Sequence, residues 1–337
     1  HSAISVLEGM KEVESNTLNF TKGIQLYNGE TNFYSAVDIN RTDKSGLQSA
    51  IEHAQNADVV VMVLGEHGYQ TGEGRSRSQI GLPGMQQELL EAVYEVNPNI
   101  VLVVKSGRPL SITWADEHVP AILEAWHLGT QSGLAITDVL YGDYNPSGKL
   151  PMTFPRHSGQ VPIYYNQKNT GKPPSDDSVV YIDDIDAHAA QTSLGMTAFH
   201  LDAGFKPLFP FGYGLSYADF EYRDIRVNAS EVGLGGTVTV SAELTNTGAV
   251  AAAEIVQLYV RDLVGSVTRP VRELKGFERV LLEPGETVTV AFQLNSDDLA
   301  FYDRDMNLSV EPGEFHVWIG GNSETEMRTG FRIIKSD

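Results

Sequence analysis

The chain has 337 residues, 41% of them apolar and none of them cysteine, so it can hold two domains with separate cores but no disulfide or thiolate metal site. Its formal net charge is -20, and the sequence shows no basic region of the kind that binds nucleic acids or anionic membrane surfaces. Neutral or cationic ligands are compatible with this charge. No apolar stretch reaches the length needed to cross a bilayer, so neither nucleic acid nor membrane is predicted as a partner.

The first half of the chain alternates apolar strands with amphipathic helices. Helical spacing of apolar residues predicts three helices, at 46–57, 83–97 and 132–142, the last of them closed by Gly142. Continuous apolar runs predict three strands that are buried on both faces, at 58–65, 99–104 and 121–126. Such a βαβ series predicts a mostly parallel sheet flanked by helices, with right-handed crossovers.

From about residue 217 the pattern changes to period two. Alternating apolar and polar residues predict short strands at 237–248, 254–262, 287–295 and 313–320, and turn signals separate them. This spacing predicts an all-β antiparallel sandwich. We therefore predict an α/β domain over 1–170, an inter-domain linker over 171–216 and a β-sandwich over 217–337. The aromatic residues of the linker, among them Phe209, Phe211 and Tyr213, predict a crossing pinned by packed rings.

The stretch EHGYQTGEGRSRS, residues 66–78, directly follows the predicted strand at 58–65. Ligands of open α/β sheets gather beyond the carboxyl ends of the strands. Glu73 stands between Gly72 and Gly74, on backbone that lets a carboxyl reach a leaving oxygen, as a general acid must. From spacing alone, a solvated loop residue is the commoner case. Arg75 could bind substrate or hold the loop, and Arg77 is expected to have a structural role.

Other chemistries find little support in the sequence. The glycines of this stretch do not match a phosphate-binding pattern, and no nucleophile-elbow motif occurs. His67 lacks a second ligand at metal spacing, and the acidic run at 183–186 lacks the calcium-loop pattern. We therefore predict no metal and no organic cofactor.

Several segments, taken in chain order, resemble the C-terminal portion of glycoside hydrolase family 3 β-glucosidases of the bacterial three-domain type. They are 59–93, 106–112, 121–155, 207–217 and 269–287. The most specific part is GDYNPSGKLPMTFP followed by FPFGYGLSY in one chain. The resemblance extends over the whole sequence.

The resemblance implies a six-stranded α/β sandwich domain followed by a fibronectin type III-like sandwich. In such enzymes a (β/α)8 barrel comes first and carries the aspartate nucleophile, while one loop of the next domain supplies the acid/base glutamate. The segment TGEGRSR matches that loop, so the resemblance makes Glu73 the acid/base rather than Glu66, with Arg75 as a substrate-binding residue. This chain contains no eight βα units, so the barrel is expected as a partner, possibly as a separate chain.

The implied activity is exo-acting, retaining hydrolysis of terminal β-D-glucosyl residues from β-glucosides and oligosaccharides. The resemblance also implies a periplasmic or secreted location, and the fibronectin-like domain offers a surface for a homodimer. Two alternatives remain open at this point: a non-catalytic carbohydrate-binding or scaffold module, and an enzyme of the same family that cleaves xylosides or arabinosides. The insertion at 179–206 is longer than in the commonest relatives and is expected to influence outer subsites.

Overall fold

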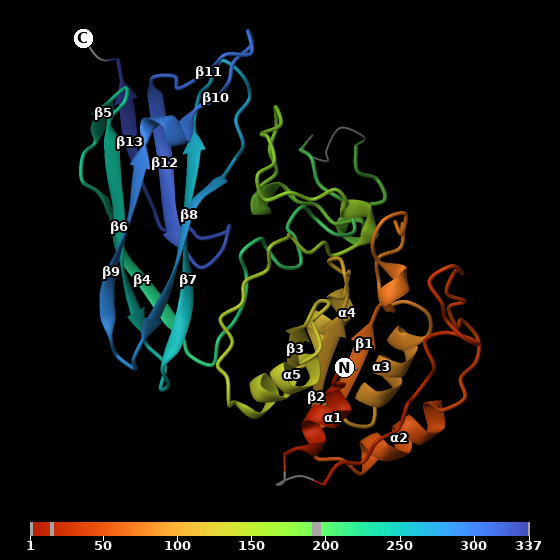
Figure 1. Ribbon diagram of the computed structural model, residues 1–337. Helices are drawn as coiled ribbons and strands as arrows, with labels where there is room; N and C mark the ends of the chain where they lie inside the picture. Colours follow the sequence, from red (N-terminus) through yellow and green to blue (C-terminus); the bar gives the residue numbers. More distant parts are fainter. Residues whose placement is uncertain (1–2, 14–16, 191–196, 336–337) are drawn as a thin grey trace. The chain divides into compact units, whose positions relative to one another are not determined.

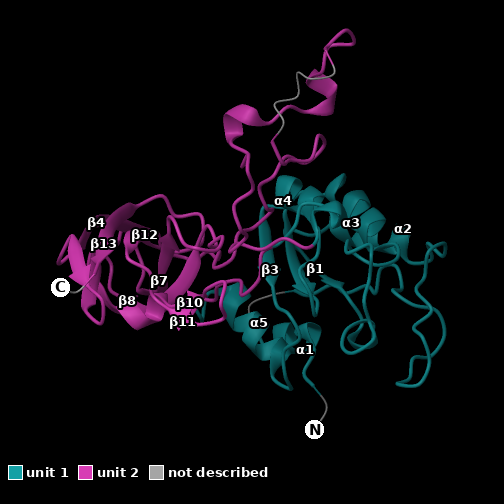
Figure 2. Cartoon of the chain, turned by 90° about the horizontal axis from the view of Figure 1, so that it is seen from above, with its two compact units in different colours: residues 1–144, 154–161 teal, residues 145–153, 162–337 magenta. Residues whose placement is uncertain are grey.

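The computed structural model describes residues 3–13, 17–190 and 197–335. The chain forms two compact units, shown in different colours in Figure 2. The first unit comprises 1–144 and 154–161, and the second comprises 145–153 and 162–337. The chain therefore enters the second unit, returns to the first, and enters the second again. The domain boundaries at residues 170 and 216 were drawn from changes in sequence composition, and they stay a prediction.

The first unit contains a parallel sheet with the order β1-β2-β3. The central strand is largely buried, because Ile100, Leu102, Val103 and Val104 are all 0% exposed. The strands are β1 (Val60–Gly65), β2 (Ile100–Lys105) and β3 (Ala121–Glu124). The helices are α1 (Val6–Lys11), α2 (Leu47–Gln55), α3 (Gln86–Tyr94), α4 (Thr113–His118) and α5 (Ser132–Tyr141). Each predicted strand and helix of this half is present, and α1 and α4 are additions (Figure 1).

The sheet differs from the expectation in the number of its strands and in the burial of β1. The resemblance implies six strands, whereas the sheet formed by the described residues has three. The prediction that strand 58–65 is buried on both faces is wrong, because Val59, just before β1, and Val63 of β1 are 49% and 43% exposed. The reason is that β1 lies at the edge of the sheet, where the side chains have neighbours on one side only.

Close helix packing covers part of one face of the sheet. Val6 of α1 and Ile136 of α5 share an apolar cluster with Val103 of β2. The two helices approach closely at Gly133, where a Cβ atom would lie 2.0 Å from the carbonyl oxygen of Ser5. Helix α5 ends at Gly142, which has a φ of 83°, as the sequence predicts.

The second unit contains a β-sandwich whose period-two pattern was predicted from the sequence. One sheet has the order β5-β13-β12-β7-β8 and the other β4-β6-β9, while β10 and β11 form a separate pair. Alternate residues of β6, among them Val238, Val240 and Leu244, are buried against residues of β7 such as Leu258. The strands are β4 (Phe220–Val227), β5 (Glu231–Gly233), β6 (Thr237–Asn246), β7 (Ala252–Asp262), β8 (Glu273–Leu282), β9 (Thr287–Asn295), β10 (Phe301–Tyr302), β11 (Leu308–Ser309), β12 (Gly313–Gly320) and β13 (Arg328–Ile334).

The linker aromatics make ring contacts inside the second unit. Phe211 stacks on Tyr165 at 4.2 Å between ring centroids, and Phe209 stacks on Tyr213 at 5.3 Å. All of these rings are half-buried. The linker contains the short 3-10 helices η3 (Asp176–Ser178) and η4 (Ile182–Asp184), and residues 191–196 of the predicted insertion lie outside the described residues.

The segment 145–153 is held firmly in the second unit. Leu150 exchanges backbone hydrogen bonds with this unit, donating to the carbonyl of Tyr213 and accepting from the N–H of Gly212, each at 2.8 Å. Lys149 forms a largely buried ion pair with Glu254 of β7 at 3.1 Å, and Tyr222 of β4 donates a hydrogen bond to the same carboxylate at 2.9 Å. Among the described residues, no helix has the length and apolar character needed to cross a membrane.

Candidate active site

The carboxyl ends of β1 and β2 meet at one edge of the sheet, and the stretch 66–78 begins there. Gly65 ends β1 with a φ of 134°, and a Cβ atom at this position would lie 2.0 Å from the carbonyl oxygen of Lys105. The side chain of Gln86 clamps the strand end, because it accepts from Gly65 N at 2.6 Å and donates to Gly65 O at 2.7 Å. Only glycine fits this turn, which directs the next residues off the sheet.

Glu66 is a buried anchor rather than an exposed acid. Its side chain is 0% exposed and accepts from Arg77 Nη1 at 2.6 Å. Arg108 Nε lies 3.0 Å from the same carboxylate. Arg77 also donates to the carbonyl of Gly81 at 3.0 Å, so it has the structural role that the sequence analysis expects.

Arg108 is a residue of this region that the sequence analysis did not single out. Its Nη2 donates to the carbonyl oxygens of Gln70 and Arg75, at 2.7 and 2.8 Å. These two carbonyls bracket Glu73 in the sequence, so one guanidinium holds both sides of the loop. The signal in the sequence was topological: Arg108 follows the end of β2, and the ends of adjacent parallel strands share one edge of a sheet.

Glu73 occupies an exposed turn on this loop. Its neighbours Gly72 and Gly74 have φ values of 107° and 67°, and nothing lies within 4 Å of a Cβ atom built at either position. Glu73 is therefore carried on exposed backbone whose flanking positions adopt the positive φ values that favour glycine. Arg75 donates through Nε to the carbonyl of Tyr69 at 3.1 Å, which ties the loop to itself. Its role in substrate binding stays a prediction.

Ring contacts stiffen the first part of the loop. His67 Nδ1 accepts from the N–H of Tyr69 at 3.1 Å and caps the 3-10 helix η1 (Gly68–Gln70). The ring of Tyr69 contacts the rings of His67 and Phe33, with centroid distances of 5.1 and 6.3 Å. The loop is thus anchored before Glu73 by rings and after it by Arg77 and Arg108.

Glu124, at the end of β3, is a half-buried carboxyl near this edge. Burial raises the pKa of Glu124 from 4.5 to about 7, with the charge of Glu66 adding to the rise. Hydrogen bonds from Trp126 N at 3.0 Å and from Ser106 Oγ at 3.3 Å act in the opposite direction. Burial also lowers the pKa of His127, whose Nε2 lies 3.0 Å from Thr71 Oγ1.

The raised pKa of Glu124 predicts how stability changes with pH. The folded chain retains this proton up to about pH 7, whereas the unfolded chain releases it near pH 4.5, so ionisation lowers stability as the pH rises through this window. A shift of this size corresponds to roughly 3 kcal/mol. Glu124→Gln cannot ionise and is expected to lose less stability than the parent between about pH 5 and pH 8.

Chemical denaturation at the two pH values measures this difference. Glu117→Gln, which replaces an exposed carboxyl on α4, serves as the control and should retain the pH dependence of the parent. If Glu124→Gln retains that dependence as well, Glu124 does not carry the proton in the folded state.

The arrangement offers one exposed carboxyl, one buried carboxyl and one half-buried carboxyl. Glu66 is neutralised by two arginines and Glu124 is half-buried, whereas Glu73 lies on an exposed turn. A retaining glycosidase needs two carboxyls about 5–5.5 Å apart, so this loop can supply one half of such a pair. Within the described ranges, no three or more His, Cys, Asp or Glu residues are grouped so that they could hold a metal ion.

Family models match both the α/β part and the β-sandwich part of this chain. Residues 1–217 match the glycosyl hydrolase family 3 C-terminal domain, and residues 254–323 match a fibronectin type III-like domain. The chain belongs to glycoside hydrolase family 3. These matches also confirm the predicted fold class, an α/β domain followed by a fibronectin type III-like one.

Known relatives extend well beyond this chain. It is 37% identical over 343 residues to the periplasmic β-glucosidase of Salmonella typhimurium, covering 99% of this chain and 43% of that protein. It is 39% identical over 325 residues to a β-xylosidase of Formosa agariphila, covering 96% and 40%. Among solved structures, a β-glucosidase from Erythrobacter marinus superposes with a TM-score of 0.85 at 34% identity, covering 99% and 44%. The chain thus spans less than half the length of these relatives.

Proposed function

We propose that this chain is part of a retaining, exo-acting β-glucosidase and that Glu73 is its general acid/base. The observation that carries the proposal is the exposed position of Glu73 between two left-handed glycines, on a loop held by Arg77 and Arg108. The β-glucosidases among the relatives support glucosides as the substrate class.

In the proposed mechanism, the region that the relatives have and this chain lacks supplies a (β/α)8 barrel with the nucleophilic aspartate. That aspartate attacks the anomeric carbon while Glu73 donates its proton to the departing glycosidic oxygen. In the second step Glu73 takes a proton from the water that releases the sugar. The acid role requires a raised pKa, which enclosure of Glu73 beside the nucleophile in the whole enzyme would provide.

The partners and location follow from the same proposal. The barrel, in the same protein or as a separate chain, is the required partner, and β-linked glucosides are the substrates. The name of the Salmonella relative supports a periplasmic or secreted location. A homodimer through the fibronectin-like domain stays a prediction.

A second candidate is a β-xylosidase of the same family, which the Formosa relative favours. In the proposed mechanism the barrel makes most contacts with the sugar that is released, so Glu73 would serve either substrate. Turnover of matched aryl β-glucoside and aryl β-xyloside by the whole enzyme decides between the two.

The split of the site predicts that residues 1–337 alone hydrolyse no aryl β-glucoside above the rate without enzyme, because only one of the two required carboxyls is present. Supplying the barrel should produce turnover, and the Glu73→Ala chain supplied with the same barrel is the matched control. Turnover by a barrel-free sample would contradict the division of the site. A chain that binds sugars but yields no turnover with any barrel would instead support a carbohydrate-binding or scaffold module.

A further inference from the structure

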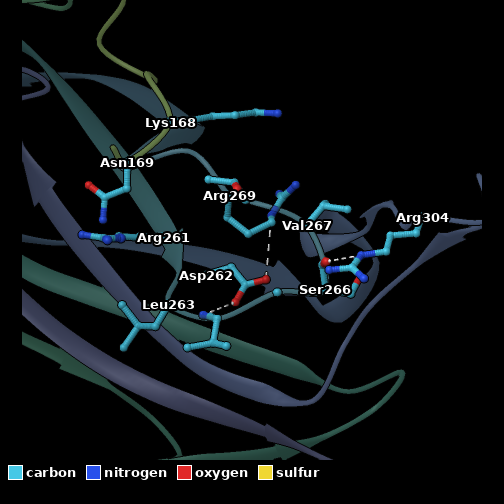
Figure 3. Close-up of a pocket in the computed structure, with 12 residues that line it drawn as sticks. Lys168, Asn169, Arg261, Asp262, Leu263, Ser266, Val267, Arg269 and Arg304 are labelled. Carbon is cyan, nitrogen blue, oxygen red and sulfur yellow. Dashed lines mark hydrogen bonds and ion pairs between the residues drawn. The ribbon is translucent and has the colours of Figure 1, made fainter. Parts of the chain in front are cut away.

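The β-sandwich unit contains a pocket of about 770 Å³. Figure 3 draws the residues around it. One wall is the end of β7 and the loop that follows it, and the others come from Lys168 and Asn169 and from Arg304 in the turn after β10. Its lining is mainly polar and charged, and the residues that the argument uses are Lys168, Asn169, Arg261, Thr268, Arg269 and Arg304.

Four cationic side chains line the pocket, and only one of them is neutralised. Arg269 pairs with Glu273 at 2.9 Å and lies 3.7 Å from Asp262. Arg304 donates through Nε to the carbonyl of Ser266 at 3.0 Å, which leaves its charge uncompensated. In the described parts of the chain, neither Lys168 nor Arg261 forms a side-chain hydrogen bond or ion pair.

The nearby carboxylates lie in the walls of the pocket, where Asp262 Oδ2 has no hydrogen-bond partner among the described residues and faces Arg269 Nε at 3.7 Å. Asp262 is 5% exposed, and its Oδ1 accepts from the N–H of Val264 at 3.2 Å. Glu311 accepts from the N–H of Ser266 at 2.8 Å and so holds the loop. The pocket therefore gathers three unpaired cations, Lys168, Arg261 and Arg304, on a chain whose net charge is -20. Such a local reversal of sign favours an anion, although the whole chain disfavours one.

The chemistry of the lining narrows the class of anion. The planar guanidinium of Arg261 matches a carboxylate with two parallel hydrogen bonds, and Lys168 adds a point charge. The amide of Asn169 and the hydroxyl of Thr268 can exchange hydrogen bonds with alcohols. The volume exceeds the needs of a bare ion and lies in the usual range for small-molecule sites, about 300–1,000 Å³.

We propose that this pocket binds an acidic saccharide. The guanidinium of Arg261 binds the carboxylate of a uronate beside Asn169, Lys168 adds attraction at longer range, and hydroxyl groups of the sugar lie against Asn169 and Thr268 (Figure 3). All of the residues that line the pocket belong to the second unit, whereas Glu73 belongs to the first. The pocket would hold an acidic branch or chain of a polysaccharide by contacts that take no part in bond cleavage.

Binding of D-glucuronate to residues 1–337 at low ionic strength, followed by isothermal titration, tests the proposal. D-glucose is the matched neutral probe, and sulfate represents a free oxyanion. We expect glucuronate to bind at least tenfold more tightly than either. If glucose binds as tightly as glucuronate, the carboxylate does not contribute to binding. If sulfate binds as tightly, the pocket is a simple anion site. Either result overturns the proposal, as does a failure of glucuronate to bind.

Variants place the site on the structure. Arg261→Gln is expected to weaken glucuronate binding about tenfold and Lys168→Gln by a smaller factor, and neither side chain forms a hydrogen bond or ion pair within the described parts of the chain. Arg226→Gln, which removes an exposed arginine of β4 in the same unit, should bind like the parent. If both pocket variants bind like the parent, the pocket is not the site. Glu73→Ala should bind glucuronate normally, so the outcome is independent of the proposed catalytic role.

Discussion

In the whole enzyme, Glu73→Gln is expected to slow cleavage of a β-linked glucose disaccharide by about 10²–10⁴-fold, the usual contribution of general acid catalysis. A sugar departs as a poor alkoxide and needs the proton, whereas a dinitrophenolate departs without it. The glycosylation step should therefore be damaged far less with dinitrophenyl glucoside. Single-turnover kinetics on both substrates measures the difference in leaving-group dependence.

Azide separates loss of the acid/base from general damage to the site. In Glu73→Ala, azide can attack the glycosyl-enzyme intermediate without a general base, so it should restore part of the rate. The product should be β-glucosyl azide, with retained configuration. Glu66→Ala should show neither the leaving-group dependence nor the rescue. If Glu66→Ala shows both and Glu73→Ala has normal kinetics, the assignment of the acid/base is wrong; if neither variant shows them, the acid/base lies outside this loop.

Glu66→Ala is expected to damage the fold instead. Its carboxylate is 0% exposed and neutralises Arg77 and Arg108, whose side chains are each 20% exposed. Removing one member of a buried ionic group leaves unpaired charges in the interior and typically lowers the free energy of unfolding by about 3–5 kcal/mol. Denaturant-dependent hydrogen exchange of the β1 and β2 amides measures the loss where it should occur.

Glu88→Ala is the matched control for that experiment. Its ion pair with Lys44 has side chains that are 41% and 56% exposed, and surface pairs of this kind contribute at most about 1 kcal/mol. A loss in Glu66→Ala no larger than that in Glu88→Ala would show that the buried group does not anchor the loop.

Local signals in the sequence were sufficient to predict the helices and strands and the exposed, glycine-flanked position of Glu73. Helical spacing predicted the helix that became α5, and the glycine that ends it has the left-handed backbone such an ending requires. The glycines on either side of Glu73 indicated an exposed carboxyl, and its exposure and their positive φ values agree with that prediction. These features depend on neighbouring residues alone, so a linear sequence contains them.

Features that depend on distant residues were missed. An apolar run such as 58–65 does not reveal whether its strand is central or at an edge, because that depends on which strands pair, and Val63 proved exposed. Arg108 holds the loop from more than thirty positions away, and its place after the end of β2 indicates the sheet edge but not which carbonyl groups it binds. The raised pKa of Glu124 likewise arises from enclosure by the fold and not from its sequence neighbours.

The route of segment 145–153 makes the β-sandwich difficult to transplant. A single cut at residue 161 would leave behind the strip that contains Lys149, because this strip precedes the return of the chain to the first unit. Glu254, whose side chain is only 5% exposed, would then keep the hydroxyl of Tyr222 but lose its cation. A chimera that exchanges sandwiches between related enzymes therefore has to take both stretches, 145–153 and 162–337, from the same parent. Recombination that separates the two stretches would separate Lys149 from Glu254.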